Sequence, residues 1–250
     1  MCAVSVAGTM ESMQTLIEAR SLFKDFGPTR ALRGVDLTVS AGESVAIMGP
    51  SGSGKTTLLH SVAGIETPDA GQVLLHRLGT TVDVAALSDR RRSELRRTAF
   101  GFVFQQGLLL PELTAAENVA LPLLLLGTAR ADAEFEAARL LDLLGIGDKA
   151  QSRIGELSGG QQQRVAIARA QAAQPEVVFA DEPTGALDSV TSAEVMAALL
   201  ASTVGSGRAL VVVTHDAGVA ARCDRTLHMA DGMMVESTGV EAAARAGETS

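Results

Sequence analysis

Residues 44–63 predict a strand, a glycine-rich loop and a helix in direct succession. The strand Ser44–Met48 is short and apolar, and Gly54–Ala63 has a helical pattern. Between them, the run GPSGSGKT at 49–56 matches the P-loop spacing G-x-x-x-x-G-K-[ST] in full. The glycines of such a loop let successive N–H groups wrap a phosphate chain. We expect a phosphate site here, made by Gly49, Ser51, Gly52, Ser53, Gly54, Lys55, Thr56 and Thr57. Lys55 is placed for the β- and γ-phosphates, and the Thr56 hydroxyl for Mg²⁺.

Strands and helices alternate on both sides of a long helical stretch, which predicts a parallel sheet covered on both faces. The further elements of this core are expected at Ser88–Arg97 (helix), Gly101–Phe104 (strand), Val177–Ala180 (strand), Thr191–Ser202 (helix), Ala209–Val213 (strand) and Thr226–Glu236 (hairpin). The strand-rich first quarter, with Thr15–Glu18 and Val35–Val39, predicts a small antiparallel sheet attached to this core. Gln72–Leu75 and Thr81–Val84 are candidates for further short strands.

Residues 107–165 change in character, because Leu, Ala and Glu dominate there. Phe135, Ala138, Leu141 and Leu144 follow helical spacing within Ala131–Leu144. This pattern predicts an inserted helical subdomain. The predicted fold class is therefore α/β: a P-loop NTPase core with a parallel sheet, an N-terminal antiparallel β subdomain and an inserted α-helical subdomain. We expect one domain over 15–236, a disordered tail over 1–14 and a frayed tail over 237–250.

The amino-acid composition limits the kinds of partner and ligand that this chain is expected to bind. The 250 residues carry a net charge of −8, which argues against nucleic acid as the main partner. No apolar run approaches the roughly 18–20 residues that span a bilayer. The two cysteines, Cys2 and Cys223, suit a reducing cytosol and predict inert thiols. Since Trp and Tyr are absent, only Phe offers an aromatic ring for base stacking.

Polar residues follow two apolar strands. Asp181 and Glu182 end the first, and His215 ends the second. The carboxyl ends of strands are where open α/β sheets bind ligands. With a P-loop upstream, Asp181 is placed to hold Mg²⁺ through water, Glu182 to orient or deprotonate the attacking water, and His215 to reach the γ-phosphate. Taken alone, a solvated acidic turn explains Asp181 and Glu182 equally well, and a histidine at a strand end is more often structural.

A second anion-binding helix start is predicted at Leu157–Arg164. Ser158 is a good N-cap, Gly159 and Gly160 expose backbone N–H groups, and Gln162–Ala172 suits a helix. The positive end of a helix dipole favours a phosphate. The pattern thus places two phosphate sites in one chain.

These motifs, in this order, closely resemble those of the ATP-binding subunit of ABC transporters over about residues 15–236. The resemblance rests on the P-loop, Gln105 after Phe102-Val103-Phe104, the signature Leu157–Gln161, Asp181-Glu182, Ala186-Leu187-Asp188 and His215. It implies ATP and Mg²⁺ as ligands and a head-to-tail dimer, with the P-loop of one subunit facing the signature of the other. The residues that it places on the nucleotide in trans are Ser158, Gly159, Gly160 and Gln161, with Asp188 at the dimer interface.

The resemblance also assigns two further residues. Gln105 would touch the Mg²⁺ or the attacking water and join the core to the helical subdomain. Phe26 stands where many members have a Tyr that stacks on adenine. Phe keeps the aromatic ring that can stack on a base and lacks the hydroxyl. The alternative interpretation is that Phe26 packs in the core. Gly185 stands where Ser is common.

Residues 101–105 and 109–119 resemble the branch that serves lipoprotein release, macrolide and peptide export, and cell division. This implies three features: a partner permease with an extracytoplasmic domain, a second ATPase subunit, expected to be a second copy, and a place on the cytoplasmic face of the cell membrane. Pro111–Val119 would lie beside the groove for the permease. A solvated face is the favoured reading of Arg90, Arg91, Arg92, Arg96 and Arg97; a face toward anionic lipid or the permease is the alternative.

Two other function classes stay open. A soluble ABC ATPase acting on DNA or ribosomes usually carries two cassettes or a long coiled coil, neither of which is visible here. A nucleotide-binding module without hydrolysis is opposed by the intact Lys55, Asp181, Glu182 and His215.

Overall fold

The computed structural model describes residues 14–77 and 79–235. Both predicted tails therefore lie outside the described residues, apart from Gln14. Glu236, at the end of the predicted hairpin, and Cys2 lie outside them as well. Among the residues described, no helix is long and apolar enough to cross a membrane.

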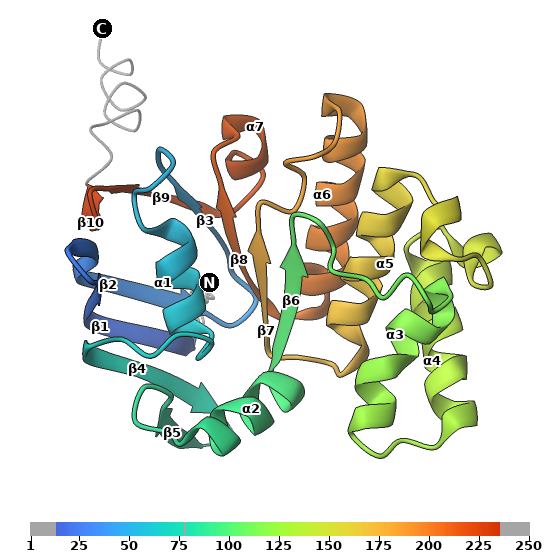
Figure 1. Ribbon diagram of the computed structural model, residues 1–250, viewed down its shortest axis with the longest axis horizontal. Helices are drawn as coiled ribbons and strands as arrows, with labels where there is room; N and C mark the ends of the chain where they lie inside the picture. Colours follow the sequence, from blue (N-terminus) through green and yellow to red (C-terminus); the bar gives the residue numbers. More distant parts are fainter. Residues whose placement is uncertain (1–13, 78, 236–250) are drawn as a thin grey trace, which may run out of the picture.

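Two sheets form the core of the molecule (Figure 1). The first is antiparallel, in the order β2-β1-β4-β5. Its strands are β1 (Thr15–Phe26), β2 (Thr29–Ser40), β4 (Ala70–Arg77) and β5 (Thr80–Asp83). The predicted antiparallel sheet is confirmed, but β1 and β2 run much further toward the turn Gly27-Pro28 than expected. The short prediction for β1 stopped where the strand is irregular, since Ser21 has a φ of 47° and the pairing register shifts between Ala19 and Leu22.

The second sheet has the order β10-β9-β3-β8-β7-β6. Its strands are β3 (Ser44–Met48), β6 (Phe100–Phe104), β7 (Val177–Asp181), β8 (Ala209–Thr214), β9 (Arg225–Ala230) and β10 (Met233–Val235). All neighbouring pairs are parallel except β9 with β10, which form the predicted hairpin. Its turn, Asp231-Gly232, has positive φ at both residues, as a two-residue hairpin turn favours.

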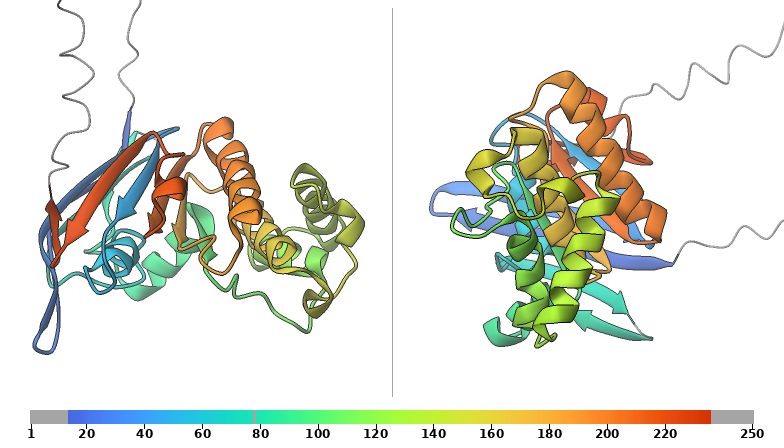
Figure 2. Two further views of the ribbon diagram at one scale, coloured as in Figure 1. Left: turned by 90° about the horizontal axis from the view of Figure 1, so that it is seen from above. Right: turned by 90° about the vertical axis from the view of Figure 1, so that its right-hand side faces the viewer.

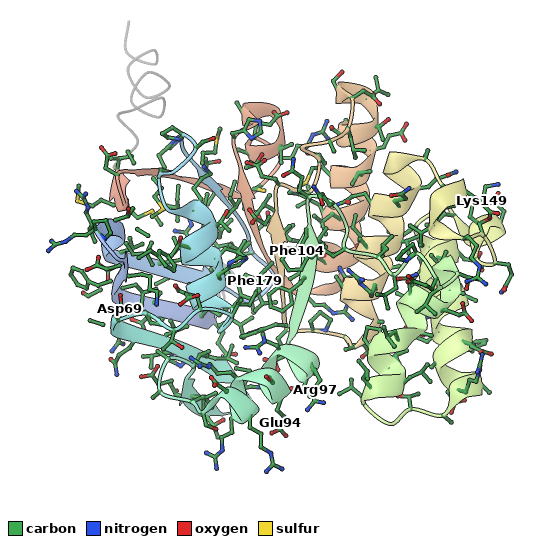
Figure 3. The ribbon with its side chains drawn as sticks, in the orientation of Figure 1. Asp69, Glu94, Arg97, Phe104, Lys149 and Phe179 are labelled. Carbon is green, nitrogen blue, oxygen red and sulfur yellow. The ribbon has the colours of Figure 1, made fainter. Side chains whose placement is uncertain are left out.

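Alternation along these strands sorts their side chains into two apolar cores. On β7, Val177 and Phe179 join the core shared with β1, β2, β4 and α1, whereas Val178 and Ala180 join the core shared with the later helices. Figure 3 shows Phe104 and Phe179 near the centre of the molecule. The Phe179 ring meets the Phe100 ring edge to face at 5.2 Å. The sheet is thus buried on both faces, as the alternating pattern predicted.

Seven α-helices complete the part of the chain that is described. They are α1 (Lys55–Val62), α2 (Asp89–Thr98), α3 (Ala115–Leu125), α4 (Arg130–Leu143), α5 (Gly159–Ala172), α6 (Ser189–Thr203) and α7 (Ala217–Ala220). Short 3-10 turns lie at Gly147–Lys149, Ile154–Glu156 and Val204–Ser206. Figure 2 shows α3 and α4 at the end of the molecule away from β1 and β2. The predicted α/β fold class, with helices inserted between β6 and β7, is confirmed.

The predicted helical spacing in α4 matches its buried face only in part. Phe135 is 74% exposed and Ala138 is also exposed. The buried residues of α4 are Ala133, Ala137, Leu140 and Leu141, and Leu144 at its C-cap is buried as well. The small side chains of Ala133 and Ala137 let α4 approach α3 and α5 closely. Of the four residues that marked the predicted spacing, Leu141 and Leu144 are therefore buried, whereas Phe135 and Ala138 are not.

Asp224 joins the starts of β3 and β9. Its Oδ2 accepts hydrogen bonds from the amide (2.8 Å) and hydroxyl (2.7 Å) of Ser44, and the Asp224 amide donates to Ser44 Oγ at 2.9 Å. The Ser44 hydroxyl, and then its amide, hold the pKa of Asp224 below its usual range. At the neighbouring position, burial raises the pKa of the Cys223 thiol to about 11, so this thiol is protonated at neutral pH.

We expect Asp224→Asn to lower Tm at pH 7 by roughly 2–4 °C, the shift that about 1 kcal/mol produces in a chain of this size. Because the folded pKa is the lower one, the carboxylate stabilises the fold above the unfolded pKa of about 3.9 and loses this effect as pH falls through the folded pKa. Thermal unfolding from pH 7 to pH 3 should therefore show the parent and variant converging. Asp148→Asn, at an exposed pair with Lys149, is the control. An equal gap at both pH values would contradict this account.

Candidate active site

The predicted phosphate loop packs so closely that two of its glycines have no room for a side chain. A Cβ on Gly49 would overlap the Met229 carbonyl oxygen, and one on Gly54 would overlap that of Ala31. A hydrogen bond also joins the loop to the β9–β10 turn, since the Gly232 amide donates to Ser53 O at 3.1 Å. The loop backbone is therefore held between β2 and β9 in one conformation.

The loop ends in an open helix N-terminus. Gly54 caps α1 with a φ of 99° and offers no side chain, and the first turn holds no acidic residue. The Lys55 side chain is buried, and its Nζ donates to Gly49 O (2.8 Å) and Pro50 O (2.9 Å). The Ser53 hydroxyl is buried with no partner among the residues described. A phosphate fits this set of unneutralised donors.

Thr56 and Asp181 meet at the start of α1. The Thr56 hydroxyl donates to Asp181 Oδ1 at 3.2 Å. Burial raises the pKa of Asp181 above its usual value, and a cation beside it would lower that pKa again. A hydroxyl and a carboxylate are oxygen ligands of the kind that Mg²⁺ takes together with phosphate oxygens and water. The two residues therefore fit Mg²⁺.

Glu182 is fixed by the next strand. Its Oε1 lies 2.8 Å from His215 Nδ1, and its Oε2 accepts from the Thr214 hydroxyl at 3.4 Å. The backbone of Glu182 has a φ of 48°, which is uncommon for a residue other than glycine, and its amide donates to Val213 O at 2.9 Å. Local strain of this kind collects at functional sites. The direct contact of Glu182 with Thr214 and His215 was not foreseen from the sequence.

Four of the predicted residues line one cavity of about 300 Å³: Thr56, Gln105, Asp181 and Glu182. Gln105 enters from the segment after β6. Its amide lies against Gly185, where a Cβ would stand 3.0 Å from Gln105 Nε2. The departure at Gly185 noted in the sequence thus leaves space for Gln105. Lys55 adjoins this cavity through Thr56, its neighbour on α1.

Helix α5 holds the segment that carries Gln105. Gln163 Nε2 donates to Phe104 O at 3.1 Å, and the Arg169 guanidinium donates to Leu108 O (2.7 Å) and Gly107 O (2.6 Å). Burial lowers the pKa of Arg169. The contacts of Gln163 and Arg169 could not be predicted from the sequence, because the positions of residues on a helix do not indicate contacts with a loop about sixty residues earlier.

The signature forms the predicted N-terminus of α5, and Ser158 is its N-cap as expected. Ser158 Oγ accepts from the Gln161 amide (3.3 Å), and Gln161 Oε1 accepts from the Ser158 amide (2.9 Å). This capping box occupies the amides of Ser158 and Gln161. The Gly159 and Gly160 amides keep no partner among the described residues. They are the donors left for an anion.

The signature packs against the start of α6. A Cβ on Gly159 would stand 3.2 Å from Leu187 Cδ2, and one on Gly160 would crowd Thr191 Cγ2. Asp188 caps α6, since its Oδ1 accepts from the Val190 and Thr191 amides at 3.0 Å. These hydrogen bonds, that of the Thr191 amide foremost, hold the pKa of Asp188 low. The signature and Asp188 therefore belong to one packed unit.

Apart from Phe26, the predicted residues fall into two separate groups. Neither Ser158–Gln161 nor Asp188 lines the cavity of Thr56 and Glu182, and in the described ranges no hydrogen bond joins them to the phosphate loop. Phe26 lies apart from both, at the tip of β1. Its side chain is 50% exposed, which excludes the alternative that it is a core residue.

Comparisons with known proteins agree with this geometry. A family model described as "ABC transporter" matches residues 32–185. The lipoprotein-releasing system ATP-binding protein LolD of Porphyromonas gingivalis is 43% identical over 88% of this chain and 98% of its own. The macrolide export ATP-binding/permease protein MacB of Marinobacter nauticus is 46% identical over 92% of this chain. The chain spans only 36% of that relative's length.

The fold recurs in solved structures. The dimeric ATP-binding cassette MJ0796, in a post-hydrolysis state bound to ADP and Pi, superposes with a TM-score of 0.78 at 38% identity. The match covers 88% of this chain and 96% of that one. The chain therefore belongs to the ABC transporter family and is an ATP-binding, ATP-hydrolysing subunit.

Proposed function

We propose that this chain is the ATPase of a membrane complex of the lipoprotein-release or macrolide-export type, acting as a peripheral subunit on the cytoplasmic face. Residues 15–236 would be its single ATPase domain, with the helical subdomain at about 107–165. The observation that carries the proposal is the cavity shared by Thr56, Gln105, Asp181 and Glu182, in a chain that matches LolD over nearly its whole length.

ATP would lie along the phosphate loop, with its γ-phosphate at the cavity. The loop amides from Gly49, Ser51, Gly52, Ser53 and Gly54 to Thr57 would hold the phosphates, Lys55 would turn from its carbonyl partners to the γ-phosphate, and Phe26 would stack on the base. Thr56 and Asp181, with Gln105 nearby, would hold Mg²⁺, which neutralises charge on the phosphates. Glu182 would take the proton of the attacking water, and His215 would fix the Glu182 carboxylate.

A second copy would complete this site. Because Ser158, Gly159, Gly160 and Gln161 do not reach the phosphate loop of their own subunit, they would contact the γ-phosphate bound by the partner. Asp188 would lie at the same interface. The resulting symmetric dimer would hold two ATP molecules between its subunits.

The permease, with an extracytoplasmic domain, would dock between α2 and α3. A cavity of about 240 Å³ opens there between Arg96, Arg97, Phe102, Leu121, Pro122 and Leu125, and one of about 530 Å³ adjoins it at Ile65 and Arg90. Figure 3 shows Arg97 projecting from α2. Arg90, Arg91 and Arg97 have no ion pair among the residues described, whereas Arg92 bonds Thr67 and Asp89, and Arg96 bonds the Gly64 carbonyl. Arg92 and Arg96 are partly buried, whereas Arg90, Arg91 and Arg97 are exposed.

Co-expression with the permease encoded nearest to this chain tests the proposal. We expect the two to co-purify, and the double variant Arg90→Glu, Arg97→Glu to lower recovery at least tenfold while ATP binding is kept. Arg130→Glu, at an exposed position on α4, is the matched control. If the double variant co-purified with the permease as well as the parent chain does, the proposed docking site between α2 and α3 would be wrong. Stimulation of the ATPase by DNA or ribosomes, without any permease bound, would favour the soluble class instead.

A further inference from the structure

Lys24 lies beneath the ring of Phe26. The two residues stand two apart on β1, yet Lys24 is only 9% exposed whereas Phe26 is 50% exposed. The ammonium of Lys24 lies 5.3 Å from the centroid of the Phe26 ring. A cation at this distance is attracted to the ring face, so it holds the ring while leaving the exposed side of the ring free.

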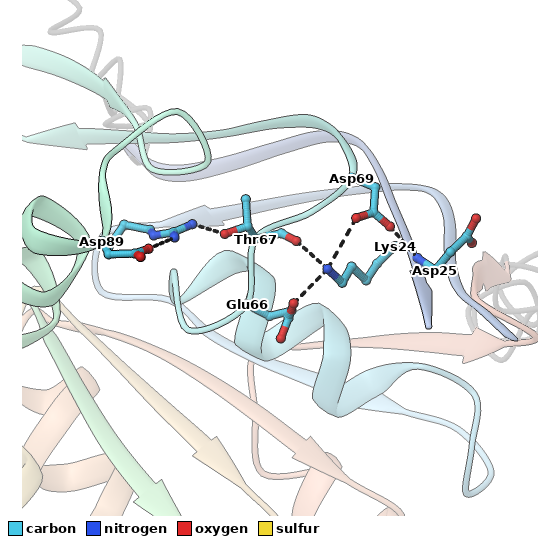
Figure 4. Close-up of polar contacts among 7 residues, drawn as sticks. Lys24, Asp25, Glu66, Thr67, Asp69 and Asp89 are labelled. Atoms are coloured by element: carbon cyan, nitrogen blue, oxygen red, sulfur yellow. Dashed lines mark hydrogen bonds and ion pairs between the residues drawn. The ribbon is translucent and has the colours of Figure 1, made fainter. Parts of the chain in front are cut away.

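The ammonium itself is held by the loop after α1 (Figure 4). Lys24 Nζ lies 2.7 Å from Glu66 Oε1, 2.8 Å from Thr67 O and 3.4 Å from Asp69 Oδ1. The bond to Glu66 is the largest cause that raises the pKa of Lys24, so the group stays charged. Asp69 Oδ2 also accepts from the Asp25 amide at 2.7 Å, which ties the loop to the backbone beside Phe26.

This loop is a continuation of the helix that starts at the phosphate site. The Ile65 and Glu66 amides donate to His60 O at 2.9 and 3.1 Å, and the Asp69 amide donates to Phe23 O at 2.8 Å. Arg92 of α2 bonds the Thr67 hydroxyl from the other side. One helix, α1, thereby connects the phosphate loop at its start with the clamp around Lys24 at its end.

We propose that Lys24 is a positioning residue for the nucleobase, which fixes the Phe26 ring at a set place relative to the phosphate loop. The inference rests on the proposed role of Phe26 as the surface on which the base stacks. A nucleotide bound at both ends gains from the stack only when the ring already stands where the base arrives. Lys24 would therefore raise affinity for a nucleotide and leave affinity for a bare polyphosphate unchanged.

The experiment compares ATP with inorganic tripolyphosphate, which has no base, by calorimetric titration in the presence of Mg²⁺. For Lys24→Met we expect about a five- to tenfold weaker Kd for ATP, part of the effect of a lost base stack, and a Kd for tripolyphosphate within about twofold of the parent. Lys24→Arg keeps a cation for the ring and the carboxylates and should restore most of the ATP affinity. Arg20→Met removes an exposed ion pair with Glu18 on the same strand, and should change neither Kd.

Two further variants separate the possible results. Phe26→Leu should weaken ATP binding at least as much as Lys24→Met, and the double variant should be no weaker than Phe26→Leu alone. Asp69→Asn should shift ATP affinity in the same direction, and it supplies the test if Lys24→Met does not fold. Equal weakening of ATP and tripolyphosphate by Lys24→Met, or a loss fully additive with Phe26→Leu, would overturn the positioning role. Unchanged ATP affinity in Phe26→Leu would instead overturn the proposed stacking role of Phe26.

Discussion

Glu182→Gln is expected to keep ATP binding, to abolish turnover and to trap a dimer with ATP between its subunits. The amide that replaces the carboxylate has nearly the same shape and can still bond His215, but it cannot accept the proton of the attacking water. General-base catalysis contributes about 10²–10⁴-fold in rate, so phosphate release should fall by at least that factor. The phosphate loop, Lys55 and Phe26 are untouched, and ATP affinity should therefore stay at the parental value.

Size-exclusion chromatography with ATP and Mg²⁺, together with a phosphate-release assay, measures both effects. The matched control is Glu176→Gln, because Glu176 lies at the opposite end of β7 and pairs with Arg77 at 2.8 Å. The control should hydrolyse ATP at the parental rate and elute as the parent does. A Glu182→Gln chain that stays monomeric and hydrolyses at the parental rate would remove Glu182 from the proposed mechanism.

The parts of the fold that could be predicted depend on local order in the sequence. The strand β3, the loop after it and the ends of β7 at Asp181 and of β8 just before His215 follow from apolar runs that stop at particular residues. The true length of β1 could not be predicted in the same way, because the irregularity at Ser21 breaks the alternation that marks a strand. The bounds of helix α3 could not be predicted for a similar reason, because Pro122 lies inside the helix and proline normally ends one.

The site was predictable in its residue types and not in its contacts. Spacing placed Thr56, Asp181 and Glu182 at the same edge of a sheet, since parallel strands share their carboxyl edge. It could not reveal that Thr214 and His215 hold Glu182, or that Gln163 and Arg169 hold the Gln105 segment. Those contacts join residues far apart in sequence, and only the packing of α5 and β8 brings them together.

Helix α5 contacts parts of the molecule that belong to both predicted anion sites. Its first residues pack on the start of α6, and Gln163 and Arg169 grip the segment that carries Gln105. The helix that presents the signature is therefore also the helix that bonds the backbone on both sides of Gln105. These contacts would connect two nucleotide sites only if the signature binds the γ-phosphate held by another subunit. A mixing experiment tests whether it does.

Two inactive variants should regain activity when they are mixed. Lys55→Met removes the ammonium from the phosphate loop, and Ser158→Arg disrupts the cap of α5 and fills the space before Gly159 and Gly160. Each variant alone carries the same damage at both sites of a symmetric dimer, so each should be nearly inactive. In a mixed dimer, the intact phosphate loop of the Ser158→Arg chain meets the intact signature of the Lys55→Met chain. One complete site is restored, and the other site carries both changes.

At equal amounts of the two variants, about half of the dimers are mixed and each has one complete site, so activity should return to about a quarter of the parental rate. The measurement is phosphate release as a function of mixing ratio, with a maximum expected at equal amounts. Ser158→Arg alone should still bind ATP as a monomer, because its phosphate loop is intact. Ser88→Arg, the same change at the start of α2, controls for the new side chain and should leave the parental rate. If Lys55 and Ser158 acted within one chain, every mixed dimer would hold two damaged sites, and no mixing ratio would raise the rate above that of the separate variants.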